Sequence, residues 1–186
     1  QSRLDPDPVP YVDLREVLRE TLLIVGGKTK RFSIEQVIPD SLPLLTCFRS
    51  HIGQVMTNLL ANAADALSEK ADRARRKGGS FQGNIRIASK AQQRDGVAGV
   101  ALQVADNGDG VAEEIREKIF EDFFTTKPAG VGTGLGLSMC ATIIKDHGGT
   151  IAVTDDEELG GALFEVWLPL STGVQEEAPI TAAEPA

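Results

Sequence analysis

The sequence predicts an α+β domain in which helices form a layer against one largely antiparallel sheet. Helical patterns and strand-like runs are mixed along the chain, and no internal repeat interrupts them. The 186 residues, 41% of them hydrophobic, are enough for one domain with a sizeable core.

The first half of the chain is predicted to hold two helices separated by two short strands. Apolar residues recur at helical spacing over residues 14–25, and this helix is expected to stop at Gly26–Gly27. The run RFSIEQVI (31–38) alternates like a strand, and PLLTCF (43–48) favours a second one. A long helix, capped by its first residue, is expected over residues 50–67.

The second half is predicted to be richer in strands. The runs NIRIASKA (84–91) and VALQVAD (100–106) have the composition and alternation of strands. A short helix over residues 113–120 and a longer one over residues 134–147 are expected to follow. The chain then closes as a hairpin over residues 150–169, which turns at a pair of glycines.

Both ends of the chain differ from this patterned core. Residues 1–10 are rich in proline and are expected to form a linker. Residues 171–186 are small, acidic and proline-bearing, which favours a disordered tail or a second linker. The folded domain is thus expected over residues 11–170. Since the chain does not begin with methionine, we expect further domains outside it.

Charge and hydropathy exclude several classes of partner. The formal net charge of −8 argues against broad nucleic-acid binding, which depends on the neutralisation of phosphates. The basic run over residues 70–79 goes against this trend, and a solvated helix end followed by a loop is its expected structure. The chain shows no run of eighteen apolar residues and no signal peptide. We therefore expect a cytoplasmic domain without direct membrane contact.

The cysteines and histidines do not favour a metal site. Cys47 and Cys140 both stand in apolar surroundings, and neither they nor His51 and His147 have the paired spacing of metal ligands. Buried, reduced thiols are therefore the expected state of both cysteines.

Three polar side chains border the apolar stripe of the long helix. Asn58, Asn62 and Asp65 stand at positions i, i+4 and i+7, so they share one narrow face. Asparagine is a poor residue in the middle of a helix, because its side chain competes for backbone hydrogen bonds. Side-chain oxygens at this spacing suit Mg²⁺, which takes few protein ligands, although a solvated polar face has the same pattern.

A second polar group follows a buried strand. Val100, Leu102, Val104 and Asp106 alternate, so Asp106 continues an inward-facing apolar row. A carboxylate there needs hydrogen-bond donors, which the amino group of an adenine can supply. The glycines at positions 108 and 110 would let a flat ring approach. A simple Asp-Asn-Gly turn explains the same residues.

The third group is the glycine-rich run TTKPAGVGTGLGLSMC (125–140), which leads into an apolar helix. Phe120, Phe123 and Phe124 precede it, as expected for a movable lid anchored by aromatic residues. A helix that begins at Gly134 and Gly136 offers unpaired N–H groups to a phosphate, and Lys127 adds a positive charge. A flexible loop before a core helix is the alternative, and the pattern is not that of a P-loop.

The order of these motifs resembles the N, G1, F and G2 boxes of sensor histidine kinase catalytic domains. The resemblance spans about residues 11–170, and four boxes in this order are far more specific than any one of them. It implies the Bergerat fold of the wider ATPase and kinase superfamily, a two-layer sandwich that binds ATP and Mg²⁺ under a lid. The stretch FFTTK (123–127) is similar to the nitrogen-regulatory subgroup.

The resemblance also implies roles for individual residues. Asn62 would be the main Mg²⁺ ligand with Asn58 as its neighbour, and Asp106 would bind the adenine amino group. The residue patterns and the resemblance together predict that the nucleotide or its metal ion is contacted by Asn58, Asn62, Asp65, Asp106, Gly108, Gly110, Phe120, Lys127, Gly132, Thr133, Gly134, Leu135, Gly136 and Leu137.

The phosphoacceptor histidine of the resembled family is expected outside this chain. His51 and His147 are better interpreted as structural residues, so the acceptor is expected on a dimerisation segment before Gln1. The resemblance implies a homodimeric parent protein and a cognate response regulator or receiver domain as partner. One departure is Ala162, which follows Gly161 where the family usually has threonine.

Asn58 separates this chain from relatives that hydrolyse ATP or phosphorylate serine. Those relatives carry a glutamate at this position, because water or a hydroxyl must lose a proton to attack. An amide cannot act as that base, whereas a neutral histidine acceptor already has a lone pair. A histidine kinase is therefore favoured, with an ATPase, a serine kinase or a degenerate nucleotide-binding module as alternatives.

Overall fold

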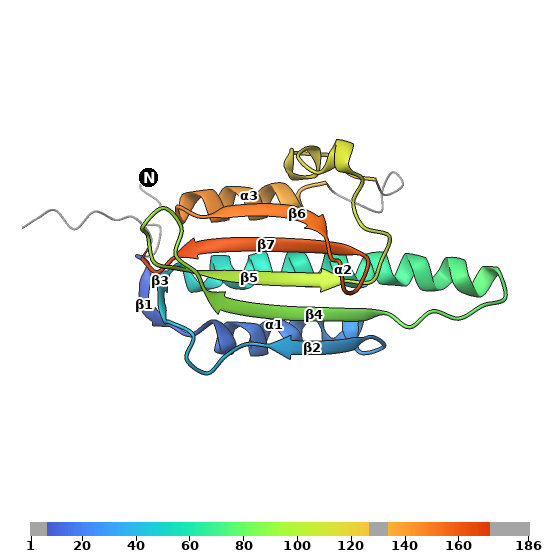
Figure 1. The fold of residues 1–186 in the computed structure, drawn as a ribbon, viewed down its shortest axis with the longest axis horizontal. Coiled ribbons are helices and arrows are strands. Elements are labelled where there is room, and N and C mark those ends of the chain that lie inside the picture. The colour runs from blue at the N-terminus through green and yellow to red at the C-terminus, as the bar shows by residue number, and fades with distance from the viewer. Residues whose placement is uncertain (1–6, 127–133, 172–186) are drawn as a thin grey trace, which may run out of the picture.

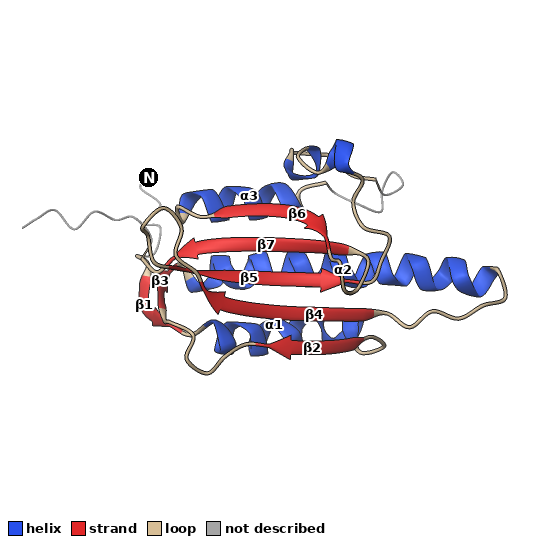
Figure 2. Cartoon of the chain, viewed as in Figure 1, coloured by secondary structure: helices blue, strands red, loops and turns tan. Residues whose placement is uncertain are grey.

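The computed structural model of the protein describes residues 7–126 and 134–171. It has two layers, with three helices packed on one face of a five-stranded sheet (Figure 1, Figure 2). The helices are α1 (Leu14–Thr29), α2 (Arg49–Arg76) and α3 (Gly136–Asp146). The strands are β1 (Val9–Val12), β2 (Ser33–Val37), β3 (Leu45–Cys47), β4 (Asn84–Ala91), β5 (Gly99–Asp106), β6 (Thr150–Asp155) and β7 (Ala162–Pro169), and two 3-10 turns are η1 (Glu113–Ile115) and η2 (Lys118–Phe120).

The main sheet is mixed and mostly antiparallel, as predicted. Its strand order is β2-β4-β5-β7-β6, in which only the β2–β4 pair is parallel. A separate antiparallel pair joins β1 to β3 at one end of the molecule. Among the described residues, no helix has the length and apolar character that a membrane span requires.

The core lies between the sheet and the helical layer. On β5, Val100, Leu102 and Val104 are all buried in it, which confirms the inward-facing row predicted from their alternation. From the other layer, α2 contributes an apolar stripe that includes Ile52 and Leu59. Asp106 is the last residue of this row on β5. Its carboxylate is therefore buried at the end of the same strand whose apolar side chains form the core.

The first helix runs past the glycines where it was expected to stop. It continues through Gly26 and Gly27 to Thr29, so that prediction was wrong. Val25 and Thr29 are both buried, and the Thr29 hydroxyl donates to the Val25 carbonyl at 3.2 Å. Neither glycine has the positive φ that ends a helix, and the buried stripe outweighs their low helix propensity.

Replacement of Gly26 by alanine is expected to stabilise the protein by about 1 kcal/mol, the difference in helix propensity between the two residues. A Cβ at this position would meet no atom within 4 Å, so no steric cost offsets the gain. Urea denaturation followed by circular dichroism measures the change. An unchanged or lower midpoint would contradict a helical Gly26.

The second helix is longer than predicted at its C-terminal end and capped differently at its start. Its N-cap is Phe48, whose side chain makes no capping hydrogen bond, and Ser50 lies inside the first turn. Instead, the Phe48 backbone N–H donates to Nε2 of His147 at 3.1 Å. At the other end α2 continues nine residues past Leu67, into the basic run that was expected to be partly loop.

Ordered structure begins within the expected N-terminal linker. Val9 and Pro10 belong to β1, which pairs with β3, so the linker prediction is wrong for these two residues. Proline is tolerated there because β1 lies in a small two-stranded sheet and need not donate at every position. At the other end, Ser171 still forms a bridge with Thr46. The domain boundaries themselves remain a prediction.

Candidate functional site

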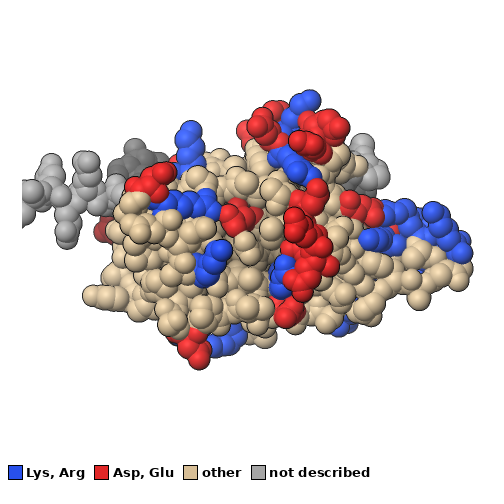
Figure 3. Space-filling view, viewed as in Figure 1, with Lys and Arg blue, Asp and Glu red and all other residues tan. Residues whose placement is uncertain are grey.

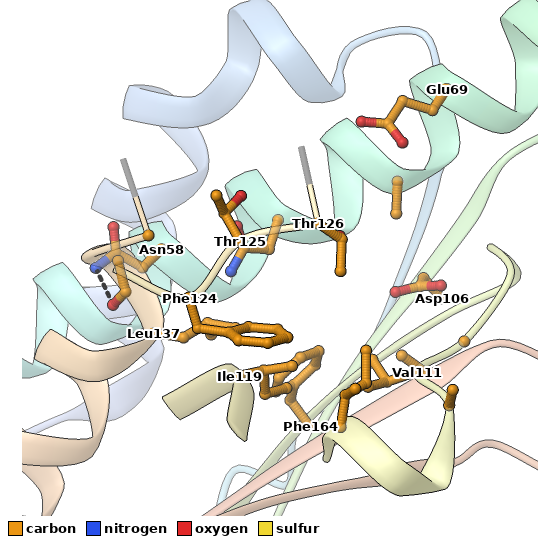
Figure 4. A pocket seen from close by; sticks show the side chains of 18 residues that line it. Asn58, Glu69, Asp106, Val111, Ile119, Phe124, Thr125, Thr126, Leu137 and Phe164 are labelled. Carbon is orange, nitrogen blue, oxygen red and sulfur yellow. Dashed lines mark hydrogen bonds between the residues drawn. The ribbon is translucent and has the colours of Figure 1, made fainter. Parts of the chain in front are cut away.

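A cleft of about 440 Å³ lies between α2, the segment after β5 and the start of α3. Its volume is typical of a site for a small-molecule ligand. The described residues that line it are Asn58, Asn62, Ala66, Glu69, Asp106, Gly110, Val111, Ala112, Ile115, Ile119, Phe124, Thr125, Thr126, Gly134, Gly136, Leu137, Ala162 and Phe164. Figure 4 shows Asp106 and Asn58 on opposite sides of the cleft, with apolar side chains between them.

Asp106 supplies a deeply buried carboxylate to this cleft. It is only 3% exposed, and burial raises the pKa of its carboxyl group above the usual value. Backbone N–H groups of Gly108 and Ala162 oppose this rise by donating to the carboxylate, and Gly108 N lies 2.8 Å from Oδ1. Asp106 therefore forms the local turn and also lines the cleft, so the two interpretations of this motif are compatible.

Glycine is required next to Asp106 because backbone atoms crowd there. A Cβ on Gly108 would lie 2.8 Å from Asp106 Oδ1. A Cβ on Gly161 would lie 2.3 Å from the Asp106 carbonyl oxygen and 2.6 Å from Gly108 N. Gly110 has a φ of 75°, a left-handed conformation that glycine adopts without strain. Of the two glycines predicted as site residues, Gly110 lines the cleft, whereas Gly108 is not among the lining residues and, with Gly161, leaves room for the backbone around Asp106.

The middle of the cleft is an apolar wall. Ile119 and Phe164 are buried, and Phe124 is partly buried against the core. Figure 4 shows these three side chains grouped between Asp106 and Asn58. Phe120, a predicted site residue, is absent from the lining; its ring packs edge-on against Phe164, with ring centroids 6.4 Å apart. Phe120 therefore packs against the wall and does not line the cleft, and its contact with a nucleotide stays a prediction.

The two asparagines of α2 both line the cleft, with Asn58 on the side opposite Asp106 (Figure 4). The Asn58 Nδ2 donates to the Gly136 carbonyl at 3.1 Å and to Sγ of Cys140 at 3.6 Å, so both amide hydrogens are directed to α3. Oδ1 of Asn58 and the whole Asn62 amide have no hydrogen-bond partner among the residues that the structure describes. These oxygens are the groups that a cation in the cleft would use.

Asp65 does not join the asparagines, contrary to the prediction. Its Oδ1 pairs with Nζ of Lys28 at 3.0 Å, in a separate cavity that is also lined by Lys30, Arg31 and Ser68. Seven residues on a helix return to nearly the same angle, so the spacing placed Asp65 on the border of the stripe. The spacing alone does not predict which other element packs beside Asp65, and in the structure that element is α1.

The start of α3 closes the Asn58 side of the cleft. Gly134, with a φ of 65°, accepts a hydrogen bond from the Phe123 N–H at 3.0 Å, and a Cβ on it would lie 2.5 Å from the Phe123 backbone. Gly136 and Leu137 line the cleft, whereas Leu135 is the N-cap of α3 and does not. The remaining predicted site residues, Lys127, Gly132 and Thr133, lie outside the described residues.

Several lining residues were not predicted from the sequence. Glu69 extends the face of Asn62 by two further turns of α2, and Thr125 and Thr126 follow the phenylalanine cluster. The place of Glu69 on the same helical face follows from its position seven residues after Asn62. It was missed because the helix was expected to end at Leu67. Phe164 comes from β7, and no sequence pattern links that strand to the cleft.

His147 and both cysteines are buried, as predicted, whereas His51 is exposed and its structural role stays a prediction. His147 is buried; its Nε2 accepts the Phe48 N–H, and its Nδ1 lies 2.7 Å from the Ile143 carbonyl oxygen. Both cysteines are free and buried, and burial raises the pKa of each thiol to about 11. Within residues 7–126 and 134–171, no three histidine, cysteine or acidic residues form a metal-binding group.

Comparison with known proteins identifies the family. Residues 48–172 match the family described as histidine kinase-, DNA gyrase B-, and HSP90-like ATPase. Among solved structures, the catalytic domain of the histidine kinase ThkA is similar with a TM-score of 0.71 and 30% identity, over 89% of this chain and 99% of that one. Full-length ShkA in complex with AMPPNP is similar with a TM-score of 0.70 and 26% identity, over 92% of this chain and 33% of that one.

The proteins similar to this chain include sensor kinases. The chain is 37% identical to the two-component sensor PprA of Pseudomonas aeruginosa over 81% of its length, and it spans 15% of that protein. It is 34% identical to the sensory histidine kinase/phosphatase NtrB of Azospirillum brasilense over 91% of its length, and it spans 41% of that protein. The chain thus belongs to the histidine kinase-, DNA gyrase B- and HSP90-like ATPase family, as an ATP-binding catalytic domain of the sensor histidine kinase type.

Proposed function

We propose that the cleft binds ATP together with Mg²⁺ and presents the γ-phosphate to a histidine on a separate segment of the parent protein. One observation carries this proposal: a buried carboxylate and two asparagine side chains line one partly apolar cleft. ShkA, which has the same fold, was solved with AMPPNP, an ATP analogue, and this supports a nucleotide as the ligand.

Asp106 is suited to recognise the adenine. An amino group donates to a carboxylate, and a bond to an ionised acceptor is about twice as strong as one between neutral groups. The apolar wall of Ile119, Phe124 and Phe164 removes water from the ring faces, while Gly110 leaves space beside them. The purine ring would thus be held by one charge-assisted hydrogen bond and by burial of apolar area.

The two asparagines are suited to hold a Mg²⁺ ion. Asn58 is oriented by α3, which takes both of its amide hydrogens and leaves Oδ1 for a cation, and Asn62 lies one turn further along α2. Amide oxygens are hard ligands of the kind that Mg²⁺ takes alongside water and phosphate oxygens. The bound ion would offset negative charge on the phosphates. The first N–H groups of α3, which no side chain caps, would face the same charge.

The arrangement favours transfer to histidine over hydrolysis or transfer to serine. The only carboxylates that line the described cleft are Asp106 and Glu69. Asp106 is assigned to the adenine, and Glu69 stands eleven residues after Asn58, about 16 Å along α2. No described acidic side chain is therefore placed beside Asn58 to deprotonate water or a hydroxyl. A neutral imidazole acceptor needs no such base.

We infer that the partners of the domain are those of two-component signalling. The similar proteins include two-component sensors, and the chain spans only part of each of them. The acceptor histidine would lie on a dimerisation segment of the parent protein, and a response regulator or receiver domain would take the phosphate from it. His51 and His147 do not serve as acceptors, because His147 is buried and both lie in or beside core helices.

The metal role of Asn62 is tested by its replacement with alanine. In titration calorimetry, ATP with Mg²⁺ should bind at least about tenfold more weakly to this variant, which is about 1.4 kcal/mol, while ATP with EDTA binds equally to variant and wild type. Gln54→Ala, an exposed polar position on the same helix, is the matched control. If Mg²⁺ strengthens ATP binding equally in both variants, Asn62 is not a metal ligand.

A further inference from the structure

The basic run over residues 70–79 is the one sequence feature that the proposed function leaves unused. Its first seven residues are the last turns of α2, which projects past the sheet in Figure 1. Basic side chains gather at this projecting end in Figure 3, and they include Arg75, Arg76 and Lys77. Lys70 and Arg73, however, point back onto the loop that follows Asp106.

Lys70 holds this loop by its backbone. Its Nζ lies 2.7 Å from the carbonyl oxygen of Asn107 and 3.0 Å from that of Gly108. The same ammonium group stands 4.8 Å from the centroid of the Phe81 ring. Its close partners are thus neutral groups, and no carboxylate of the described chain forms an ion pair with it. The positive charge of Lys70 is therefore not neutralised by an ion pair, and it lowers the pKa of the buried Asp106 carboxyl group.

The loop is also fixed from the sheet side. Oδ1 of Asn107 accepts the Asn84 N–H at 2.7 Å, and its Nδ2 donates to the Gln82 carbonyl at 2.9 Å. On the outer side, Arg73 forms an ion pair with Asp109, which is exposed to solvent. From the helical layer, Lys70 donates to the carbonyl groups of Asn107 and Gly108. These two carbonyls flank the Gly108 N–H, which donates to Asp106.

We propose that Lys70 is a positioning residue of the nucleotide site, which holds the loop after β5 so that the Asp106 carboxylate keeps its direction into the cleft. The proposal rests on the proposed function, since it assigns Lys70 to the recognition of the adenine. It also gives the unexpected length of α2 a role, because a helix that ended at Leu67 would lack this contact.

The charge of Lys70 adds a pH dependence that a purely structural contact would not have. Burial raises the pKa of Asp106, Lys70 lowers it through its charge, and Asp156 of the β6–β7 turn raises it. Asp156 is itself paired with Arg86 of β4, and Glu69 is the other acid that lines the cleft. Without Lys70 the pKa of Asp106 would be higher, so adenine binding should be lost at a higher pH as the solution is acidified.

The test compares Lys70→Met with Lys77→Met, which removes the same charge from the exposed end of the same helix. ATP with Mg²⁺ is titrated into each protein at a series of pH values that runs from neutral into the acidic range, so that the loss of binding on protonation of Asp106 can be compared. We expect Lys70→Met to bind ATP about tenfold more weakly at neutral pH and to lose binding at a higher pH than wild type. Lys77→Met should match wild type in both respects.

A third variant, Lys70→Gln, separates the two contributions of the side chain. It keeps a donor for the loop carbonyls without the charge, so part of the affinity should return while the acid loss stays shifted. Circular dichroism checks that each variant is folded. If wild type binds ATP and Lys70→Met and Lys70→Gln both match Lys77→Met, the role of Lys70 is refuted while the proposed function stands. Failure of wild type itself to bind ATP would overturn both.

Discussion

Replacement of Asp106 by asparagine is expected to weaken ATP binding strongly while the fold remains intact. The change keeps the shape of the side chain but replaces an ionised acceptor with an amide that also donates. Loss of the charge-assisted bond to the adenine amino group should weaken binding by about 2–3 kcal/mol, roughly 30- to 150-fold. Asp106 is almost fully buried, so water cannot take over the lost contact.

The matched control for this variant is Asp109→Asn. Asp109 lies three residues further along the same loop, is exposed, and forms only a surface ion pair with Arg73. Calorimetry should show ATP affinity within about twofold of wild type for Asp109→Asn, since exposed pairs contribute little. A folded Asp106→Asn protein with wild-type affinity would exclude the adenine role of this carboxylate.

Replacement of Gly161 by alanine is expected to be the most damaging single-methyl change near the cleft. The added Cβ would lie 2.3 Å from the Asp106 carbonyl oxygen, 2.6 Å from Gly108 N and 2.7 Å from Asp106 Oδ1. Two of these atoms belong to the backbone, and the third ends the buried Asp106 side chain, which is held by the Gly108 N–H, so the loop after β5 must move. We expect a loss of stability of about 1–3 kcal/mol, as for an overpacked core, together with at least tenfold weaker ATP binding.

Thermal unfolding and calorimetry on the same protein sample measure both effects of Gly161→Ala. Gly26→Ala is the comparison, because it adds the same methyl group where nothing lies within 4 Å. It should raise stability and leave ATP affinity unchanged. If Gly161→Ala has the stability and ATP affinity of wild type, close packing of Gly161 against the loop after β5 is not required for either property.

The strands were the most predictable part of the fold. The bounds expected for β4 agree with the structure, and β6 and β7 form the expected hairpin over residues 150–169, because alternating burial and turn residues mark these strands. Asp106 was predictable for the same reason: it continues an alternating row of buried residues. The apolar faces of the helices were equally clear, although the ends of the helices were not.

Helix ends and side-chain neighbours depend on tertiary contacts that no local pattern contains. The N-cap of α2 is completed by His147, ninety-nine residues away. Asp65 is drawn to α1 by Lys28, and Phe120 packs behind Phe164, a residue of the last strand. Helical periodicity places a residue on a face of its own helix, whereas the element opposite that face depends on the topology.

The basic run shows the same limit. Its charges suggested a solvated helix end, and this holds for Arg75 and Arg76, which are exposed. Lys70 and Arg73 instead contact the loop after β5, since α2 passes beside the end of that strand. Ala66 of α2 shows how close the helix comes to this loop, because a Cβ on Gly108 would lie 3.5 Å from the Ala66 side chain. No spacing in the sequence indicates this approach.

The most direct test of the proposed reaction uses labelled ATP, this chain, and the helical segment of the parent protein that carries the acceptor histidine. After incubation with Mg²⁺, half of each sample is acidified before the protein-bound label is counted. We expect label on the added segment that acid removes, as for a phosphohistidine, and no label on this chain alone. Acid-stable label on serine or threonine, or rapid hydrolysis of ATP by this chain alone, would contradict a histidine kinase domain.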